Sequence, residues 1–343
     1  MKKLLFATLF AGMLAAACDI VEFKNPADAG GGKNVRWGQV SFALAGDGVE
    51  TRSTSQAAES AVTSLQVLVY NASGNLVAYA SANSGTVSAT VPLGIAGHTV
   101  YAVTNVSDDL SDCSTPSSLT SRISYLKDNS SAGLQMIGSV DNQTFTSAST
   151  VNVEVRRFAA KVEIDQITSA FTAAAFRSQE FSVTGIYLIN VNGTCPYSQV
   201  PAAGTWYNKM QYESGDCNAL ISDKFSSAVR IQSTSGQVTP YTTKHYFYCY
   251  PNPTTTDVHR GSWSPRRTRL VVETRLGTHV YYYPIDIVGE GNVLKPNTAY
   301  TVTKLTVTGP GVEHPDDLLD NGTVNFTVTV KDWETGFSKQ VTY

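Results

Sequence analysis

Short runs in which bulky apolar residues alternate with small or polar ones recur along most of this chain. The first run is 40–44, where Val40, Phe42 and Leu44 alternate with a serine and an alanine. This period of two is typical of a strand with one buried face. Similar signals predict strands at 65–70, 76–80, 86–92, 99–106, 151–164, 183–191, 244–250, 269–275, 278–287 and 300–308. The chain is therefore expected to be all-β.

Few segments favour a helix. The best candidate in the first half is 115–127, where Thr115 can cap the first turn and apolar residues follow at helical spacing. The alanine-rich stretch 168–177 is either a short helix or a connector, and we place a domain boundary there. Because strands recur on both sides of that boundary, we expect two β-sandwiches in series.

The composition fits this fold class and argues against several functions. Charged residues make up 15% of the 343 residues, and 25 basic against 28 acidic side chains give a net charge of −3. This balance lacks the basic surplus typical of nucleic-acid binding, so no nucleic-acid partner is expected. The histidines lack metal-ligand spacing, and the chain has no nucleophile elbow, P-loop or dinucleotide fingerprint. We therefore expect no enzymatic activity, no metal and no cofactor.

Two charged clusters have ordinary interpretations. The arginines within 266–269 are interpreted as a turn that leads into an edge strand, where charge discourages aggregation. The alternative is that they form, with Trp263, a contact for carbohydrate or another protein. Asp316 and Asp317 are interpreted as part of an acidic loop exposed to solvent, and the alternative is a cation site formed with Asp320. The glycines and the proline of 309–311 lie shortly before this loop, and such residues suit a hinge.

Residues 1–18 have the order of a secretory signal, with a basic start, an apolar run and a small-residue cleavage site. Cys18 closes the site, so the segment resembles a bacterial lipoprotein signal, in which the thiol is acylated and becomes the new N-terminus. The alternative is a plain signal peptide with an incidental cysteine. No later apolar run reaches the length of a membrane span, so a lipid on Cys18 is the expected membrane attachment.

Of the five cysteines, four lie beyond Cys18. An exported protein meets an oxidising compartment, in which disulfides form. Cys195 and Cys217 are the easiest pair to join, because they bracket a loop. The alternative is that both thiols stay free. The spacing of these cysteines does not resemble that of a zinc site.

Several strand-and-turn segments together resemble a known family. They are 157–164 (RFAAKVEI), 187–191 (YLINV), 246–252 (YFYCYPN), 282–285 (YYPI), 294–300 (LKPNTAY) and 328–333 (VTVKDW). Their order and spacing resemble those of the fimbrillins, the pilins of type V fimbriae in Bacteroidales. The resemblance implies two transthyretin-like β-sandwich domains and export as a lipoprotein to the outer membrane. It also implies proteolytic maturation and polymerisation into a cell-surface fimbrium that supports adhesion.

The resemblance also implies where the chain is cut. Fimbrillins are cleaved by an arginine-specific protease in the loop after the first strand, which assigns the cut to Arg52 and makes Ser53 the new N-terminus. The cut would release the first strand and uncover an apolar groove with unpaired backbone edges. Arg36 is the competing site, but a cut there leaves the strand in place.

The expected organisation follows from the strand pattern and the resemblance together. A signal peptide is followed by a propeptide that holds a tether and the first strand, then by an N-terminal and a C-terminal β-sandwich domain, and finally by a tail. In that order, the segments are 1–18, 19–52, 53–167, 168–320 and 321–343.

The C-terminal tail carries the same alternation in two short strands separated by a turn. Its apolar residues are Val324, Phe326, Val328, Val330, Trp333, Phe337 and Val341. One interpretation is a final hairpin of its own domain. The other, which the resemblance favours, is a donor strand that leaves its subunit and fills the groove of the next one. The expected partners are then other copies of this chain or related fimbrial subunits.

A second class of function stays open. The chain could be a surface lipoprotein that never polymerises and binds glycan or a host protein through its loops, as an anchor subunit or a tip adhesin would. Deletion of 321–343 separates the two classes. A monomeric binder would keep its ligand, whereas a polymerising subunit would lose assembly.

Overall fold

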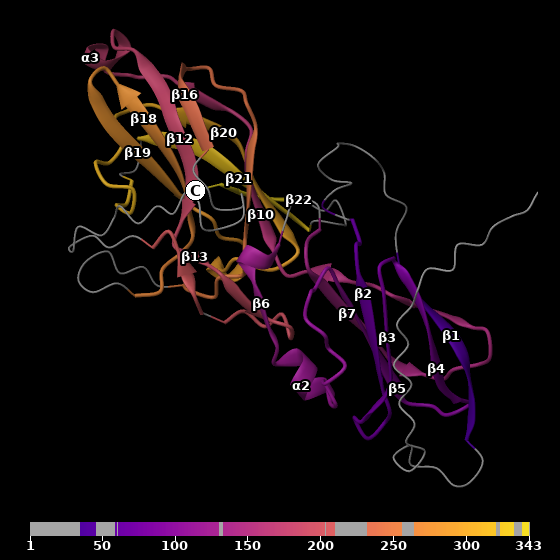
Figure 1. Cartoon of the computed structure of the whole chain (residues 1–343). Helices are drawn as coiled ribbons and strands as arrows, with labels where there is room; N and C mark the ends of the chain where they lie inside the picture. Colours follow the sequence, from indigo (N-terminus) through magenta and orange to yellow (C-terminus); the bar gives the residue numbers. More distant parts are fainter. Residues whose placement is uncertain are drawn as a thin grey trace, which may run out of the picture.

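The structure is a computed structural model, and it describes residues 35–45, 59, 61–129, 133–202, 204–209, 232–255, 264–319, 323–332 and 338–342. In these residues strands predominate and helices are short, which confirms the all-β fold class. The strands form two lobes, with the first half of the chain at the lower right of Figure 1 and the second half at the upper left. None of the helices in the described part of the chain has the length and apolarity needed to cross a lipid bilayer.

The first lobe is a sandwich of two sheets. One sheet has the strand order β3-β2-β5-β7-β9, and the other has the order β4-β1-β8. The bounds are β1 Arg36–Leu44, β2 Leu65–Tyr70, β3 Leu76–Ala82, β4 Thr86–Leu93, β5 His98–Thr104, β7 Met136–Gln143, β8 Thr150–Val153 and β9 Arg156–Arg157. Buried side chains from both sheets form one core, with Val67 and Val100 from the first sheet and Val91 and Val153 from the second.

The second lobe is built on two further sheets. One has the order β17-β10-β20-β21-β22, with β11 also beside β20, and the other has the order β16-β12-β18-β19. The bounds are β10 Ala160–Ile164, β11 Ile167–Ser169, β12 Phe181–Ile189, β16 Gln232–Val238, β17 His245–Cys249, β18 Arg269–Leu276, β19 His279–Asp286, β20 Thr298–Val307, β21 Val324–Asp332 and β22 Ser338–Thr342. This arrangement agrees with the expected two sandwiches in series, while a transthyretin-like topology stays a prediction.

Short elements connect and cover these sheets. Two small ribbons pair β13 with β15 and β6 with β14. The bounds are α2 Pro116–Thr120, β6 Ile123–Tyr125, η1 Leu126–Asp128, α3 Ala174–Arg177, β13 Val191–Asn192, β14 Thr194–Pro196, β15 Trp206–Tyr207 and η3 Glu290–Asn292. The alanine-rich stretch that was expected to be a short helix or a connector contains the end of β11 and the helix α3.

The predicted strand 151–164 is instead three strands in three sheets. β8 pairs with β1, β9 pairs with β7, and β10 pairs with β17 and β20. The backbone crosses β7 so closely that a Cβ on Gly138 would lie 1.8 Å from the carbonyl oxygen of Glu154. Alternation could not reveal the division, because it reports which side chains are buried and not which strand is the partner. As a result β10, inside the predicted N-terminal domain 53–167, lies in a sheet of the second lobe.

The predicted helix 115–127 is wrong beyond its first turns. Thr115 does cap a helix, but α2 ends at Thr120 and is followed by a strand, β6. β6 pairs with β14 of the second lobe, with Ser124 opposite Cys195. Backbone hydrogen bonds to a distant strand thus override a local helical spacing of apolar residues.

The two lobes share one hydrophobic core at their junction. Leu68 and Tyr70 of the first lobe belong to the same buried cluster as Phe247 and Tyr250 of the second. Tyr250 is fully buried, and its hydroxyl accepts a hydrogen bond of 2.7 Å from Asn129 Nδ2. The lobes are therefore joined by packed side chains as well as by the chain itself.

Candidate functional site

β1 occupies the middle of the sheet β4-β1-β8. It runs antiparallel to β4 on one side and parallel to β8 on the other, and it is paired on both edges. Figure 1 shows β1 beside β4 at the outer side of the first lobe. The strand spans Arg36–Leu44, and its first residues are largely exposed. Loss of such a central strand would leave two strands with unpaired backbone groups.

The inward side chains of β1 belong to the core of the first lobe. Val40 and Phe42 are each 1% exposed, and Leu44 is half-buried against the same core. The ring of Phe42 meets that of Phe145 edge-on, with centroids 6.0 Å apart. These three side chains therefore cover the apolar side chains of the same core, which include Phe145, Val87, Val91, Val151 and Val153.

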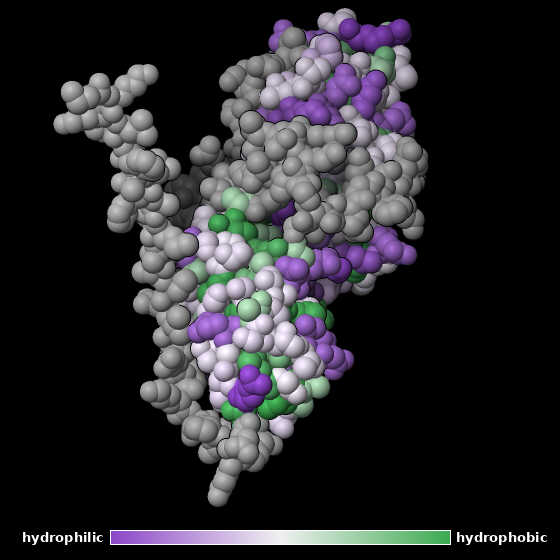
Figure 2. Space-filling view, turned by 90° about the vertical axis from the view of Figure 1, so that its right-hand side faces the viewer, coloured by the Kyte–Doolittle hydropathy of each residue, from purple (hydrophilic) through white to green (hydrophobic). Residues whose placement is uncertain are grey.

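The outward side chains of β1 are small or uncharged near its centre. Gln39 donates a hydrogen bond of 2.8 Å to Thr90, and the hydroxyls of Ser41 and Ser88 lie 3.2 Å apart. In the lower part of Figure 2, where the first lobe faces the viewer, most residues are pale and strongly hydrophilic ones are scattered. A replacement for β1 would thus need alternating apolar and small polar residues, and no charge on the inner face.

In this structure the C-terminal tail forms a hairpin on its own domain. β21 pairs with β20 on one side and with β22 on the other, and among the described strands β22 pairs with β21 alone. Val328 is fully buried, and Val324, Phe326 and Val330 are partly buried against the same core. The first of the two interpretations of the tail therefore describes this conformation.

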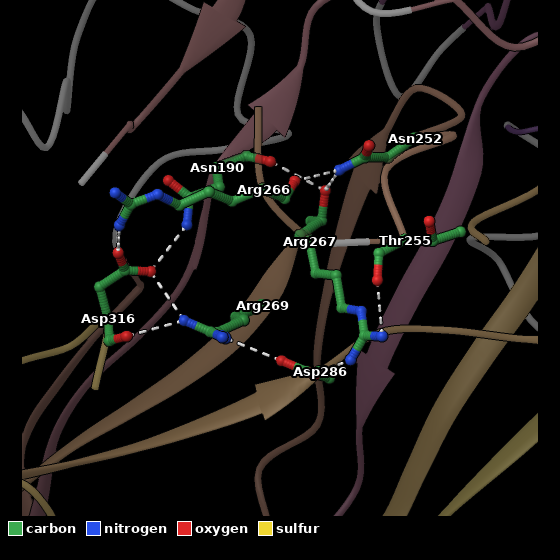
Figure 3. Close-up of polar contacts among 9 residues, drawn as sticks. Asn190, Asn252, Thr255, Arg266, Arg267, Arg269, Asp286 and Asp316 are labelled. Atoms are coloured by element: carbon green, nitrogen blue, oxygen red, sulfur yellow. Dashed lines mark hydrogen bonds and ion pairs between the residues drawn. The ribbon is translucent and has the colours of Figure 1, made fainter. Parts of the chain in front are cut away.

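A buried ionic cluster, which the sequence did not reveal, lies in the second lobe. Arg266, Arg269 and Asp316 are each at most 1% exposed, and Figure 3 shows the carboxylate of Asp316 between the two guanidinium groups. Arg269 Nη1 lies 2.7 Å from Asp316 Oδ1, and Arg266 Nη1 forms an ion pair with Oδ2. Arg269 Nε also pairs with Asp286 at 2.7 Å.

This cluster corrects both earlier interpretations of its charged residues. The arginines do not lead into an edge strand, because β18 lies between β12 and β19. Asp316 is not solvated, because it accepts hydrogen bonds from two buried arginines and from Asn190 Nδ2 at 2.9 Å. No local signal could have paired these groups, since Arg266 and Asp316 are 50 residues apart in sequence.

The sequence matches a family described as major fimbrial subunit protein (FimA) over residues 39–173. The match begins within β1 and ends beyond β11, so it covers the first sandwich and the crossing into the second. The family is one of structural subunits and not of enzymes. No curated protein sequence matches this chain.

Several solved structures share this fold over most of the chain. A putative cell adhesion protein from Bacteroides eggerthii is 16% identical with a TM-score of 0.63, over 88% of this chain and 98% of that one. A fimbrilin from Porphyromonas gingivalis is 15% identical with a TM-score of 0.61, over 86% and 97%. The tip fimbrial protein Mfa3 from Porphyromonas gingivalis is 16% identical with a TM-score of 0.54, over 87% and 100%. At these identities the likeness concerns the fold.

Several residues singled out in the sequence lie outside the described residues. These are Cys18, Arg52, Ser53, Cys217, Trp333 and Phe337. Val341 lies within the backbone of β22, opposite Val328 of β21. The lipidation, the cleavage and the donor role of the tail therefore stay predictions. Within the described part of the chain, no group of His, Cys, Asp and Glu side chains could hold a metal ion.

Cys195 is buried, and its thiol is free. Burial raises the pKa of this thiol to about 12, so the reactive thiolate is disfavoured. The thiol lies 3.5 Å from the carbonyl oxygen of Pro196, to which it can donate. Because Cys217 is outside the described residues, the pairing of these two cysteines stays a prediction.

Proposed function

We propose that this protein is a structural subunit of a cell-surface fimbrium, and that it polymerises when the tail of one subunit replaces β1 of the next. The observation that carries the proposal is the central position of β1 in its sheet. A subunit that loses this strand is left with an apolar groove between two unpaired strands. Such a groove favours the addition of a strand from another chain.

The sequence of the tail supports this exchange. The inward residues of β1 are Val40, Phe42 and Leu44, separated by single small residues. β21 repeats this order with Val324, Phe326 and Val328, separated by an asparagine and a threonine. With the phenylalanines superimposed, the aromatic ring of the donor would meet Phe145, and the polar residues would face Ser88 and Thr86.

The free energy of burial and hydrogen bonding supports strand exchange as a stable contact between two subunits. Three buried apolar side chains at about 1.5–3 kcal/mol each, with several backbone hydrogen bonds at about 0.5–1.5 kcal/mol each, amount to roughly 10 kcal/mol before the cost of association. Part of this is offset because Val328 is already buried in its own domain. The net driving force then comes from covering the groove that cleavage opens.

The geometry of the exchange would generate a fibre. The groove belongs to the first lobe and the tail to the second, so each contact joins unlike surfaces of two subunits. A head-to-tail contact that does not close into a ring propagates into a filament. In this scheme Cys18 carries the lipid that delivers the subunit to the outer membrane, and cleavage after Arg52 by an arginine-specific protease removes both the lipid and β1.

Substitution of the cleavage site tests the proposal. Arg52→Ala is expected to give a folded, lipidated protein that keeps β1 and stays monomeric, because its groove is never opened. Arg36→Ala is the matched control and should mature and polymerise normally, since a cut at β1's first residue would not release the strand. The readouts are the N-terminal residue of surface material and the fibres seen by electron microscopy. Fibres of normal length from Arg52→Ala would refute this maturation route.

A further inference from the structure

We infer that residues 309–317 form a fixed strap, and that Asp316 is the positioning residue that sets the point from which the tail leaves the body. This inference rests on the proposed function, because it concerns how the tail is presented to the next subunit. It replaces the expectation that the glycines and the proline of 309–311 act as the hinge.

The first part of the strap is bonded to the edge of β19. Tyr282 and Val312 exchange two backbone hydrogen bonds, of 2.8 and 3.0 Å. The hydroxyl of Tyr283 donates a bond of 2.9 Å to the carbonyl oxygen of Gly309. At Gly311 a Cβ would lie 2.4 Å from the oxygen of Tyr282, so glycine here allows close contact and not motion.

The second part of the strap is held by the buried ionic cluster. Asp316 accepts from Arg266 and Arg269 through its carboxylate, and its backbone oxygen accepts a further bond of 2.8 Å from Arg269 Nη1. Withdrawal of Asp316 would leave two buried guanidinium groups without this carboxylate. Loss of one member of a buried ion pair is strongly destabilising. The strap is therefore expected to stay on the body when the tail leaves.

The bonds at the base of the tail mark where separation begins. The backbone amides of Thr308 and Gly309 both donate to the carbonyl oxygen of Thr323, at 2.9 and 3.2 Å. These bonds, and the pairing of β21 with β20, must break if β21 is donated. The link from the anchor to β21 is then 317–323, which can span at most about 25 Å when fully extended. The anchor would thereby limit how far apart two joined subunits can lie.

Two engineered disulfides distinguish a fixed strap from a mobile tail. The strap lock joins Tyr282→Cys to Val312→Cys, and the tail lock joins Thr301→Cys to Thr329→Cys; both pairs are directly opposite in antiparallel pairing and suit a disulfide. Each full-length variant is matured with the protease and compared under oxidising and reducing conditions. We expect the strap lock to polymerise like wild type in both, and the tail lock to polymerise only when reduced.

An unexpected result from the strap lock and one from the tail lock would contradict different parts of the proposal. Loss of polymer in the oxidised strap lock, with recovery on reduction, would overturn the fixed strap while leaving strand exchange intact. Polymer from the oxidised tail lock would overturn the proposed donation of β21, and with it the need for an anchor.

The role of Asp316 is tested separately. We expect Asp316→Asn to speed hydrogen exchange of the amides in 309–317 and to reduce polymer yield, whereas Asp317→Asn, the adjacent control, should change neither. Oxidation of the strap lock in the Asp316→Asn background should restore part of the yield, because it fixes residue 312 and limits the released segment to 313–323. If the strap lock leaves the yield low, Asp316 only stabilises the fold and the inference is wrong. Should Asp316→Asn fail to fold, the strap lock by itself still tests whether the strap stays on the body when the tail leaves.

Discussion

Buried ionic side chains in this protein fasten one segment to another. Glu59 is 1% exposed, and its Oε1 lies 2.9 Å from Lys161 Nζ and accepts a hydrogen bond of 2.7 Å from the Tyr248 hydroxyl. These contacts tie the chain just before β2 to the sheet of β10 and β17 in the second lobe. Asp316 does the same for the strap. In both places a charge removed from water is paired, which is the condition under which burial is tolerated.

The buried side chain of His98 is expected to make the first lobe less stable in acid. His98 is 1% exposed, its Nδ1 lies 3.1 Å from the Ile95 carbonyl oxygen, and its ring lies 5.0 Å from that of Phe145. Burial lowers the pKa of His98 below the ordinary value of 6.5. The neutral form is thus favoured in the folded state. Neutral His98 makes its full contribution to the free energy of unfolding above pH 6.5, the pKa of an unfolded histidine. This contribution is lost as the pH falls through the lowered pKa of His98 in the folded state.

We expect the melting temperature of the wild-type protein to fall when the pH is lowered from 7.5 to 5.5. The fall should be smaller in His98→Gln, which lacks the buried imidazole. Exposed His279→Gln serves as the control and should follow wild type. Thermal denaturation of the uncleaved protein at both pH values measures this, and equal falls in His98→Gln and wild type would contradict it.

At the scale of elements, the place of a strand in its sheet determines the effect of its loss. β22 pairs with β21 alone among the described strands, so its departure leaves the rest of the sheet paired. β1 is bonded on both sides, and its departure divides the sheet. A strand that is removed in maturation should therefore stabilise the precursor and contribute nothing to the fibre.

Phe42→Ala tests this division of roles. In the uncleaved protein it should lower the free energy of unfolding by about 3–5 kcal/mol, because it removes a buried ring and leaves a cavity beside Phe145. Ser41→Ala, on the outward face, is the control and should change it by about 0.5 kcal/mol or less. Urea titration measures both. Fibres assembled from Phe42→Ala should be as heat-stable as wild-type fibres, and a matching loss in the fibre would show that β1 stays in place.

At the scale of the whole molecule, the two lobes pack against each other and are not joined by the chain alone. Their junction is filled by one cluster of buried side chains from both halves, and β6 of the first half pairs with β14 of the second. Shared burial couples the stability of the two lobes. In a fibre this coupling would transmit force from the groove of the first lobe to the tail of the second through a packed interior.

We therefore expect a single unfolding transition for both lobes. Tyr250→Phe should shift it to lower urea by a loss of about 1–3 kcal/mol, because Asn129 and Ser124 lose a buried hydrogen-bond partner. Tyr246→Phe, within β17 and 41% exposed, is the control and should have little effect. Circular dichroism and tryptophan fluorescence should give coincident transitions; two separate midpoints would contradict the shared core.

Much of the element pattern was predictable from the sequence. β2 spans the predicted 65–70, and the predictions 86–92 and 269–275 differ from β4 and β18 by a single residue at one end. The buried face of β1 was also predictable, because Val40 and Phe42 alternate with small residues. These are local properties, since a strand that buries one face must alternate wherever it lies. β7 was missed, because glycine and polar residues interrupt its apolar pattern.

The all-β class, most strand positions and the matching order of valine and phenylalanine in β1 and β21 are local properties that the amino-acid order already contains. Three features became clear from the folded protein: 151–164 divides among three sheets, β6 replaces the end of a helix, and Asp316 is buried between arginines. Those outcomes depend on hydrogen bonds and ion pairs between residues far apart in the chain. Hydrophobic periodicity indicates which side of a strand is buried. The partner of a strand or of a charged side chain depends on how the whole chain packs.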